Sequence, residues 1–146
     1  MTTQNPLDTS IFDIFTRAGV SPSAGANFTQ AMNINSRSQI INVQFLLTTD
    51  ANAADREIII TGDDGTDEIY STGPSSIQTA SLAVRYHANI GAPAGTFGTA
   101  LLQTVPLNSQ FILSEGDTLQ INVTNIQAGD AITDISIRIK QWITAV

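Results

Sequence analysis

The feature that most constrains this chain is a period of two in its hydrophobic residues, which recurs from about residue 37 to residue 142. The segments 41–48, 119–124 and 135–140 each alternate apolar and polar side chains. Such alternation is typical of a strand with one buried face. Turn-forming steps such as Asp64-Gly65 separate the segments. The pattern therefore predicts an all-β protein.

Eight such segments follow one another without a helical pattern between them. They are 37–48, 57–61, 68–71, 81–90, 98–105, 111–113, 119–124 and 135–142. This order excludes a parallel α/β sheet, which needs helices between its strands. Eight antiparallel strands predict a jelly-roll-like sandwich over residues 37–146. An immunoglobulin-like sandwich is the alternative, although the chain lacks the tryptophan that follows the second strand in antibody-type domains.

Residues 1–36 differ from the rest and are predicted to form an N-terminal arm and linker. Asp8 or Thr9 can cap a short helix over residues 9–17, with Gly19 ending it. Two helical turns are not stable alone, so their apolar side chains need a cover, either on the same domain or on a neighbouring subunit. The predicted anchoring residues of this arm are Ile11, Phe12, Ile14 and Phe15.

The surface is predicted to be neutral and suited to contacts between subunits. Only 13% of the residues are charged, against roughly a quarter in typical domains. Subunit contacts are depleted in Lys, Glu and Asp, because neutral polar groups cost less to desolvate than ions. A secreted β-protein with a neutral face is the alternative. The candidate oligomer-interface residues are Asn42, Gln44, Gln120, Asn122, Thr124 and Trp142. Alternation places Trp142 on the side of Arg138 and Lys140.

The charge balance argues against a nucleic-acid partner. The formal net charge is −7, and the six basic residues are scattered along the sequence. We expect no membrane partner, because no apolar run approaches spanning length. The opening Met-Thr-Thr-Gln-Asn-Pro lacks a secretory signal pattern, so we expect synthesis in the cytosol. There is no cysteine, and hence no disulfide frame.

The residue inventory does not favour an enzyme, and no catalytic residue, cofactor or metal is predicted. His87 is the one histidine, it lies on the predicted outward face of a strand, and no Gly-x-Ser-x-Gly motif accompanies it. The acidic segment 55–68 lacks the spacing of an EF-hand, and a solvated hairpin tip explains it better than a calcium site. A carboxylate pair for glycoside cleavage can be drawn from the same segment, but the sequence does not fix its separation.

A further signal comes from turn-and-strand motifs. They are Val43-x-Phe45-x-Leu47, the segment 51–56 (ANAADR), Leu113-x-x-Gly116-Asp117-x-Leu119, the segment 125–130 (NIQAGD) and Ile139-x-x-Trp142. Over about residues 40–143 the chain resembles small phage-encoded virion proteins, among them capsid decoration (cement) proteins with a jelly-roll body. The resemblance implies trimers on the outer shell whose extended arms bridge capsomers. It implies no catalytic residues.

Two functions follow as expectations. The first is a capsid decoration protein on the outer surface of the virion. We expect it to form a homo-oligomer, namely a trimer, that binds the major capsid protein and stabilises the shell. The second is a tail-fibre or lectin-like module that binds host glycan through its amide-rich strand face. A small jelly-roll enzyme is a third and less favoured reading, since it would depend on His87 or on the acidic segment.

Overall fold

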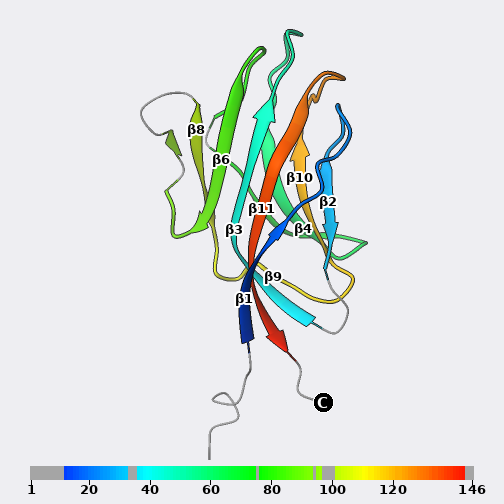
Figure 1. Ribbon diagram of the computed structural model, residues 1–146, viewed down its shortest axis with the longest axis vertical. Coiled ribbons are helices and arrows are strands. Elements are labelled where there is room, and N and C mark those ends of the chain that lie inside the picture. The colour runs from blue at the N-terminus through cyan, green and yellow to red at the C-terminus, as the bar shows by residue number, and fades with distance from the viewer. Residues whose placement is uncertain (1–11, 33–35, 75, 94, 97–100, 144–146) are drawn as a thin grey trace, which may run out of the picture.

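The computed structural model describes residues 12–32, 36–74, 76–93, 95–96 and 101–143. Within these residues every regular element is a strand, and the strands form two sheets (Figure 1). The all-β class predicted from the alternation is therefore confirmed.

The larger sheet has seven strands and the smaller has four. The larger runs in the order β1 (Phe12–Ala18), β11 (Ala131–Ile143), β3 (Ser36–Thr48), β6 (Ala83–Ile90), β8 (Leu102–Leu107) and β7 (Gly95–Thr96), with β9 (Ile112–Leu113) paired to β3. The smaller runs in the order β2 (Phe28–Ala31), β10 (Thr118–Val123), β4 (Ile58–Asp63) and β5 (Glu68–Thr72). In Figure 1, β3, β6 and β11 run side by side, and β2 and β10 lie to their right.

The two sheets share one hydrophobic core, which the period-two alternation creates. Ile137 and Ile139 of β11 face inward from the larger sheet, and Leu119 and Ile121 of β10 face inward from the smaller one. All four side chains are buried. Each such side chain stabilises the fold by about 1.5–3 kcal/mol relative to full exposure. The polar residues between them are thereby left on the outer faces.

Four antiparallel pairs are nested along the chain. β1 pairs with β11, β2 with β10, β3 with β6, and β4 with β5. Each pair lies inside the preceding one in sequence, as in a long hairpin that has been folded over on itself. The strands β7, β8 and β9 lie between β6 and β10 in the chain and extend the larger sheet only.

The helix predicted for residues 9–17 is wrong over the described part of that range. Residues 12–18 form β1, which pairs with β11 from Phe12↔Trp142 to Ala18↔Ser136. The paired backbone forms a full ladder, whereas two isolated helical turns would satisfy few backbone groups. The partner strand lies at the other end of the sequence, so local capping signals could not reveal it.

The described part of the predicted arm belongs to the β body. β1 lies at one edge of the larger sheet, and β2 lies at one edge of the smaller sheet. Phe28 and Met32 are buried in the core. The predicted boundary after residue 36 therefore falls at the start of β3, between strands of the same two sheets.

The predicted set of eight antiparallel strands is wrong in number and in one direction. β1, β2 and β7 add to the predicted strands. β8 runs parallel to β6, from Arg85↔Leu102 to Ile90↔Leu107. The strand predicted for residues 98–105 extends past its predicted end, since Pro106 lies inside β8. The Pro106 carbonyl oxygen accepts a hydrogen bond from Thr72 Oγ1 at 2.7 Å.

Candidate interaction surface

The predicted interface residues do not form one surface, because they lie on two different sheets. Asn42 and Gln44 belong to β3 of the larger sheet and alternate with the buried Val43. Gln120 and Asn122 belong to β10 of the smaller sheet. The structure therefore separates side chains that the sequence pattern had grouped.

The amides of β10 are largely engaged with their own sheet. Asn122 Nδ2 donates to Thr61 Oγ1 at 3.1 Å and to Gln120 Oε1 at 3.2 Å. Gln120 Nε2 donates to Thr118 Oγ1 at 3.1 Å. Thr124 lies just beyond β10, and its hydroxyl accepts a hydrogen bond from the Glu57 backbone N–H at 3.1 Å. These groups stabilise the smaller sheet locally.

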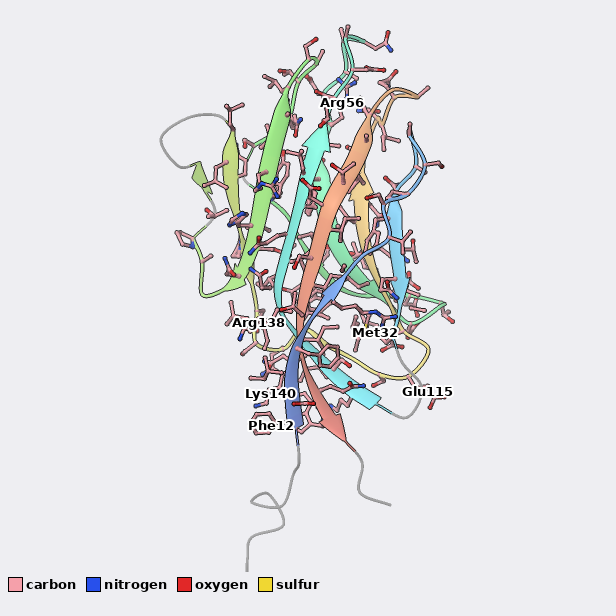
Figure 2. All side chains as sticks on the ribbon, viewed as in Figure 1. Phe12, Met32, Arg56, Glu115, Arg138 and Lys140 are labelled. Carbon is pink, nitrogen blue, oxygen red and sulfur yellow. The ribbon has the colours of Figure 1, made fainter. Side chains whose placement is uncertain are left out.

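An aromatic and cationic cluster lies at one end of the outer face of the larger sheet. Phe12 pairs with Trp142 across β1 and β11. The Lys140 ammonium lies 4.1 Å from the Phe12 ring centroid and 5.2 Å from that of Trp142. The Arg37 guanidinium lies 5.7 Å from the Trp142 ring centroid. Figure 2 shows Phe12 and Lys140 together at this end. Trp142 thus lies on the side of Lys140, as its alternation predicted.

The predicted anchoring residues are divided between the two sides of β1. Phe12 is 48% exposed and Ile14 is 46% exposed, and both lie on the outer side. Phe15 lies on the other side and packs against the core. Ile11 lies outside the described residues. Phe12 and Ile14 are therefore the members of this set that remain open for contact.

Basic residues gather on the outer face of the larger sheet. Four of the six basic residues lie there, namely Arg37, Arg85, Arg138 and Lys140. Among the described residues of this face the one carboxylate is that of Asp134. Its Oδ2 atom lies 3.2 Å from Arg85 Nη2. A face of net positive charge on a chain of net charge −7 was not predicted. The alternation of Arg138 with Ile137 and Ile139 indicated that Arg138 lies on the outer face. The strand pairing that brings Arg37 and Arg85 to the same face is not visible in the sequence.

A depression of about 450 Å³ lies on the same face. It is lined by Ile14, Thr16, Ile41, Asn42, Gln44, Asn89, Ser136 and Arg138. Its lining combines small hydroxyl side chains with longer amides and one guanidinium. The Asn42 amide donates to the Ala88 carbonyl at 3.1 Å and to the Asn89 side chain. Within the described part of the chain Arg138 forms no ion pair. Its guanidinium is therefore available to a carboxylate from outside.

His87 lies on this face of β6, between Gln44 and Thr104 in the strand register. Burial lowers the pKa of His87, and the nearby Arg85 charge lowers it further, which favours the neutral imidazole. Its Nε2 atom is buried and has no hydrogen-bond partner among the described residues. No described carboxylate or hydroxyl is therefore placed to form a catalytic pair with Nε2.

Six acidic side chains gather at one end of the smaller sheet. The β4–β5 turn supplies Asp63, Asp64, Asp67 and Glu68, and the turn before β10 supplies Glu115 and Asp117. The Thr118↔Asp63 register brings the two turns together. Ile69, 46% exposed, lies beside them. We call this group the acidic end. The described residues contain no group of three or more potential ligands arranged to hold a metal ion.

The carboxylates of the β4–β5 turn are engaged with its backbone. Asp63 Oδ1 accepts the Gly65 N–H at 2.7 Å, and Asp64 Oδ1 accepts the N–H groups of Thr66 and Asp67 at 2.9 and 2.8 Å. The hydrogen bond from the Asp67 N–H, and after it that from the Thr66 N–H, lowers the pKa of Asp64. Gly65 has φ +95°, a left-handed conformation that glycine adopts without strain. The turn is therefore well ordered by its own contacts.

A buried ion cluster at the opposite end of the molecule was missed by the sequence reasoning. Arg56 is fully buried, and its Nε and Nη2 atoms donate to the two oxygens of Asp130, both at 2.9 Å. Nη2 also donates to Asp50 at 2.9 Å, and Nη1 donates to the carbonyls of Asn52 and Ala54. We call this the Arg56 cluster. It joins the two loop segments 51–56 and 125–130.

Comparison of the chain with known protein families, with characterised proteins and with solved structures finds no significant match. The residues that the structure describes contain no helix long and apolar enough to cross a membrane. The function must therefore be argued from the surfaces described above.

Proposed function

We propose that this protein is an assembly subunit of a virus particle, a capsid decoration (cement) protein that binds the outer shell as a homo-oligomer. The observation that carries the proposal is the outer face of the larger sheet, where exposed Phe12 and Ile14 lie beside an amide-lined depression. Arg138 and Lys140 lie on the same face and form no ion pair among the described residues. A face that combines exposed apolar and charged groups without a reactive pair fits a protein partner better than a reactant.

The jelly-roll architecture is part of the same proposal. The nested pairs β1–β11, β2–β10, β3–β6 and β4–β5 support it, because a jelly roll forms when one long hairpin wraps into two sheets. With β7, β8 and β9 set aside, the sheets read β1-β11-β3-β6 and β2-β10-β4-β5. Jelly rolls are recurrent in viral capsid and lectin domains, which favours both candidate functions over a catalytic one.

In the proposed mechanism the protein bridges neighbouring capsomers of the major capsid protein. The described ends of the chain lie at the same end of the molecule, next to the cluster of Phe12 and Lys140 (Figures 1 and 2). We propose that residues 1–11, with Phe12 and Ile14, anchor the subunit to the shell or to a neighbour. Several weak contacts of one oligomer then add through their effective concentration, so the shell resists rupture.

Shell binding tests this function directly. The full-length protein should co-sediment with shells assembled from the major capsid protein of the virus that encodes it, and it should raise the temperature at which those shells rupture. A variant that lacks residues 1–11 should stay folded, since β1 begins at Phe12, and should bind shells more weakly. Deletion of residues 1–36 is not a suitable test, because it removes β1, β2 and the buried Phe28. Failure of the full-length protein to bind shells would refute the proposal.

A glycan-binding module is the second candidate, and the depression is what favours it. Amides from Asn42, Gln44 and Asn89, together with the Arg138 guanidinium, offer hydrogen bonds that suit hydroxyls and an acidic sugar. A glycan array with and without calcium tests this candidate. Binding that disappears in an Asn89→Ala variant would favour it over the decoration function.

A further inference from the structure

We propose that copies of this chain associate through a heterologous contact, in which the acidic end of one copy docks on the cationic outer face of the larger sheet of the next. This inference rests on the proposed assembly function and identifies the partner of that face as a second copy. Each half of the proposed contact is visible in a single chain, on a different sheet.

The receiving side is the strip of β11 that carries Arg138 and Lys140, with the adjoining depression. Arg138 lines the depression and has no ion pair among the described residues. The other lining groups are neutral amides, hydroxyls and two isoleucines, so a carboxylate entering the depression meets no described acid there. Exposed Ile14 borders it and supplies apolar area. The strip therefore suits a ligand that is acidic and partly apolar.

The acidic end has those properties. Asp67 and Glu68 are exposed and lie beside the exposed Ile69. All residues from 64 to 69 are exposed, so the turn projects from the molecule. Hydrogen bonds from the backbone to Asp63 and Asp64 already order the turn. An ordered turn loses little conformational entropy on docking, which lowers the cost of association.

The placement of the two surfaces determines the type of contact. A two-fold contact requires one self-complementary patch, whereas a cationic patch repels its own copy. Two complementary patches on different sheets instead favour a heterologous contact, which closes into a ring when the rotation between subunits allows it.

The rest of the surface favours the same contact. With 13% charged residues, most outward positions are neutral and cost little to desolvate around the ion pairs. Arg85 lies on the same face, but its guanidinium already forms an ion pair with Asp134. The contact should therefore depend mainly on Arg138 and Lys140, with Arg37 beside Trp142 as a further cation of this face. It should weaken as salt screens the charges.

Charge reversal on each side, followed by reversal on both sides, tests the inference in the full-length chain. R138E/K140E and D67K/E68K should each raise the dissociation constant of the oligomer, by about 10- to 100-fold for exposed pairs acting together. The variant with all four changes restores opposite charges across every contact and should reassemble. Sedimentation velocity measures the oligomer, and circular dichroism verifies that each variant is folded.

D55K/E57K is the matched control, because it makes the same charge change at exposed acids outside the acidic end. This control should assemble as the unchanged protein does. Oligomers that persist in both double variants, or a fourfold variant that stays monomeric although it is folded, would overturn the inference. Salt-insensitive oligomers of that kind would indicate another contact, such as pairing along the β1 edge. If such oligomers still bind shells, the proposed contact is wrong but the decoration function is retained. Failure of this inference is therefore distinguishable from failure of the proposed function.

Discussion

The Arg56 cluster and the strip around Arg138 use the same side chain in opposite ways. At one end of the molecule Arg56 is fully buried, and it donates hydrogen bonds to Asp50, Asp130 and two carbonyls. At the other, Arg138 is exposed on β11 and has no ion pair among the described residues. Figure 2 shows the two groups far apart along the long axis.

The difference separates a role in folding from a role in contact. A buried guanidinium whose donors are all engaged has nothing left to offer a partner, and its removal leaves buried acceptors unsatisfied. An exposed guanidinium without a carboxylate contributes little to the fold and keeps its hydrogen-bonding capacity for a partner. The partners of the guanidinium N–H groups therefore distinguish an arginine that stabilises the fold from one that can bind a partner.

The largest effect should follow from Asp130→Ala. This change leaves the Arg56 charge buried and without its principal partner, and so the free energy of unfolding should fall by about 3–5 kcal/mol. Asp134→Ala is the matched control, because its exposed pair with Arg85 should contribute about 0–1 kcal/mol. Urea unfolding measures both. Equal losses of unfolding free energy in the two variants would contradict the difference in role between buried and exposed charges.

Acidification should act on the same buried group. Burial would raise the pKa of Asp130, but hydrogen bonds from Arg56 and the Gln127 N–H outweigh it and hold the pKa below its usual value. A lowered folded-state pKa means stability that is present above the unfolded-state pKa, about 3.9, and is lost as the pH falls through the folded-state value. Unfolding measured from pH 7 down to pH 3 should show this loss. Asp130→Ala should show less of it, whereas Asp134→Ala should retain it.

Gly19→Ala should give a smaller loss, and it tests whether the N-terminal segment belongs to the body. An added Cβ would lie 2.5 Å from Ile135 Cγ2 and 2.9 Å from Ile135 Cβ, too close without displacement of β11. Overpacking of this kind costs about 1–3 kcal/mol. Val20→Ala, at a position 83% exposed, is the control and should be close to neutral. A neutral Gly19→Ala would indicate that the segment is only loosely attached.

The smallest effect on stability should come from Lys140→Ala. Its half-buried side chain places the ammonium over the Phe12 and Trp142 rings, and each such contact contributes about 0.5–1 kcal/mol near the surface. The free energy of unfolding should therefore fall by about 1–2 kcal/mol, while assembly weakens measurably. A large loss of stability without a change in assembly would assign Lys140 to the fold rather than to the contact surface.

The sequence predicted most strands of the body because their signal is local. Ile135, Ile137 and Ile139 alternate with polar residues, and the structure buries all three. Residues 9–17 were predicted as a helix from a local cap, Asp8 or Thr9, and a local stop, Gly19, whereas residues 12–18 form a strand. Pairing with β11 decides between the two, and that contact joins opposite ends of the chain. The parallel pairing of β8 with β6 is non-local for the same reason.

The candidate surface was predictable only in part. The sequence placed Trp142 on the side of Lys140, and the structure agrees. It treated Asn42 and Gln120 as members of one face, although they belong to different sheets. It also treated the basic residues as scattered, because their proximity depends on which strands are neighbours. The buried Arg56 had no local signal beyond its position in a loop of small residues.

The central claim, that this protein acts through contacts between its own copies, is tested most directly by its oligomeric state in solution. Sedimentation velocity of the full-length protein should reveal a defined oligomer at low salt that dissociates as salt screens the contact. A single monomeric species at every protein and salt concentration would contradict the account.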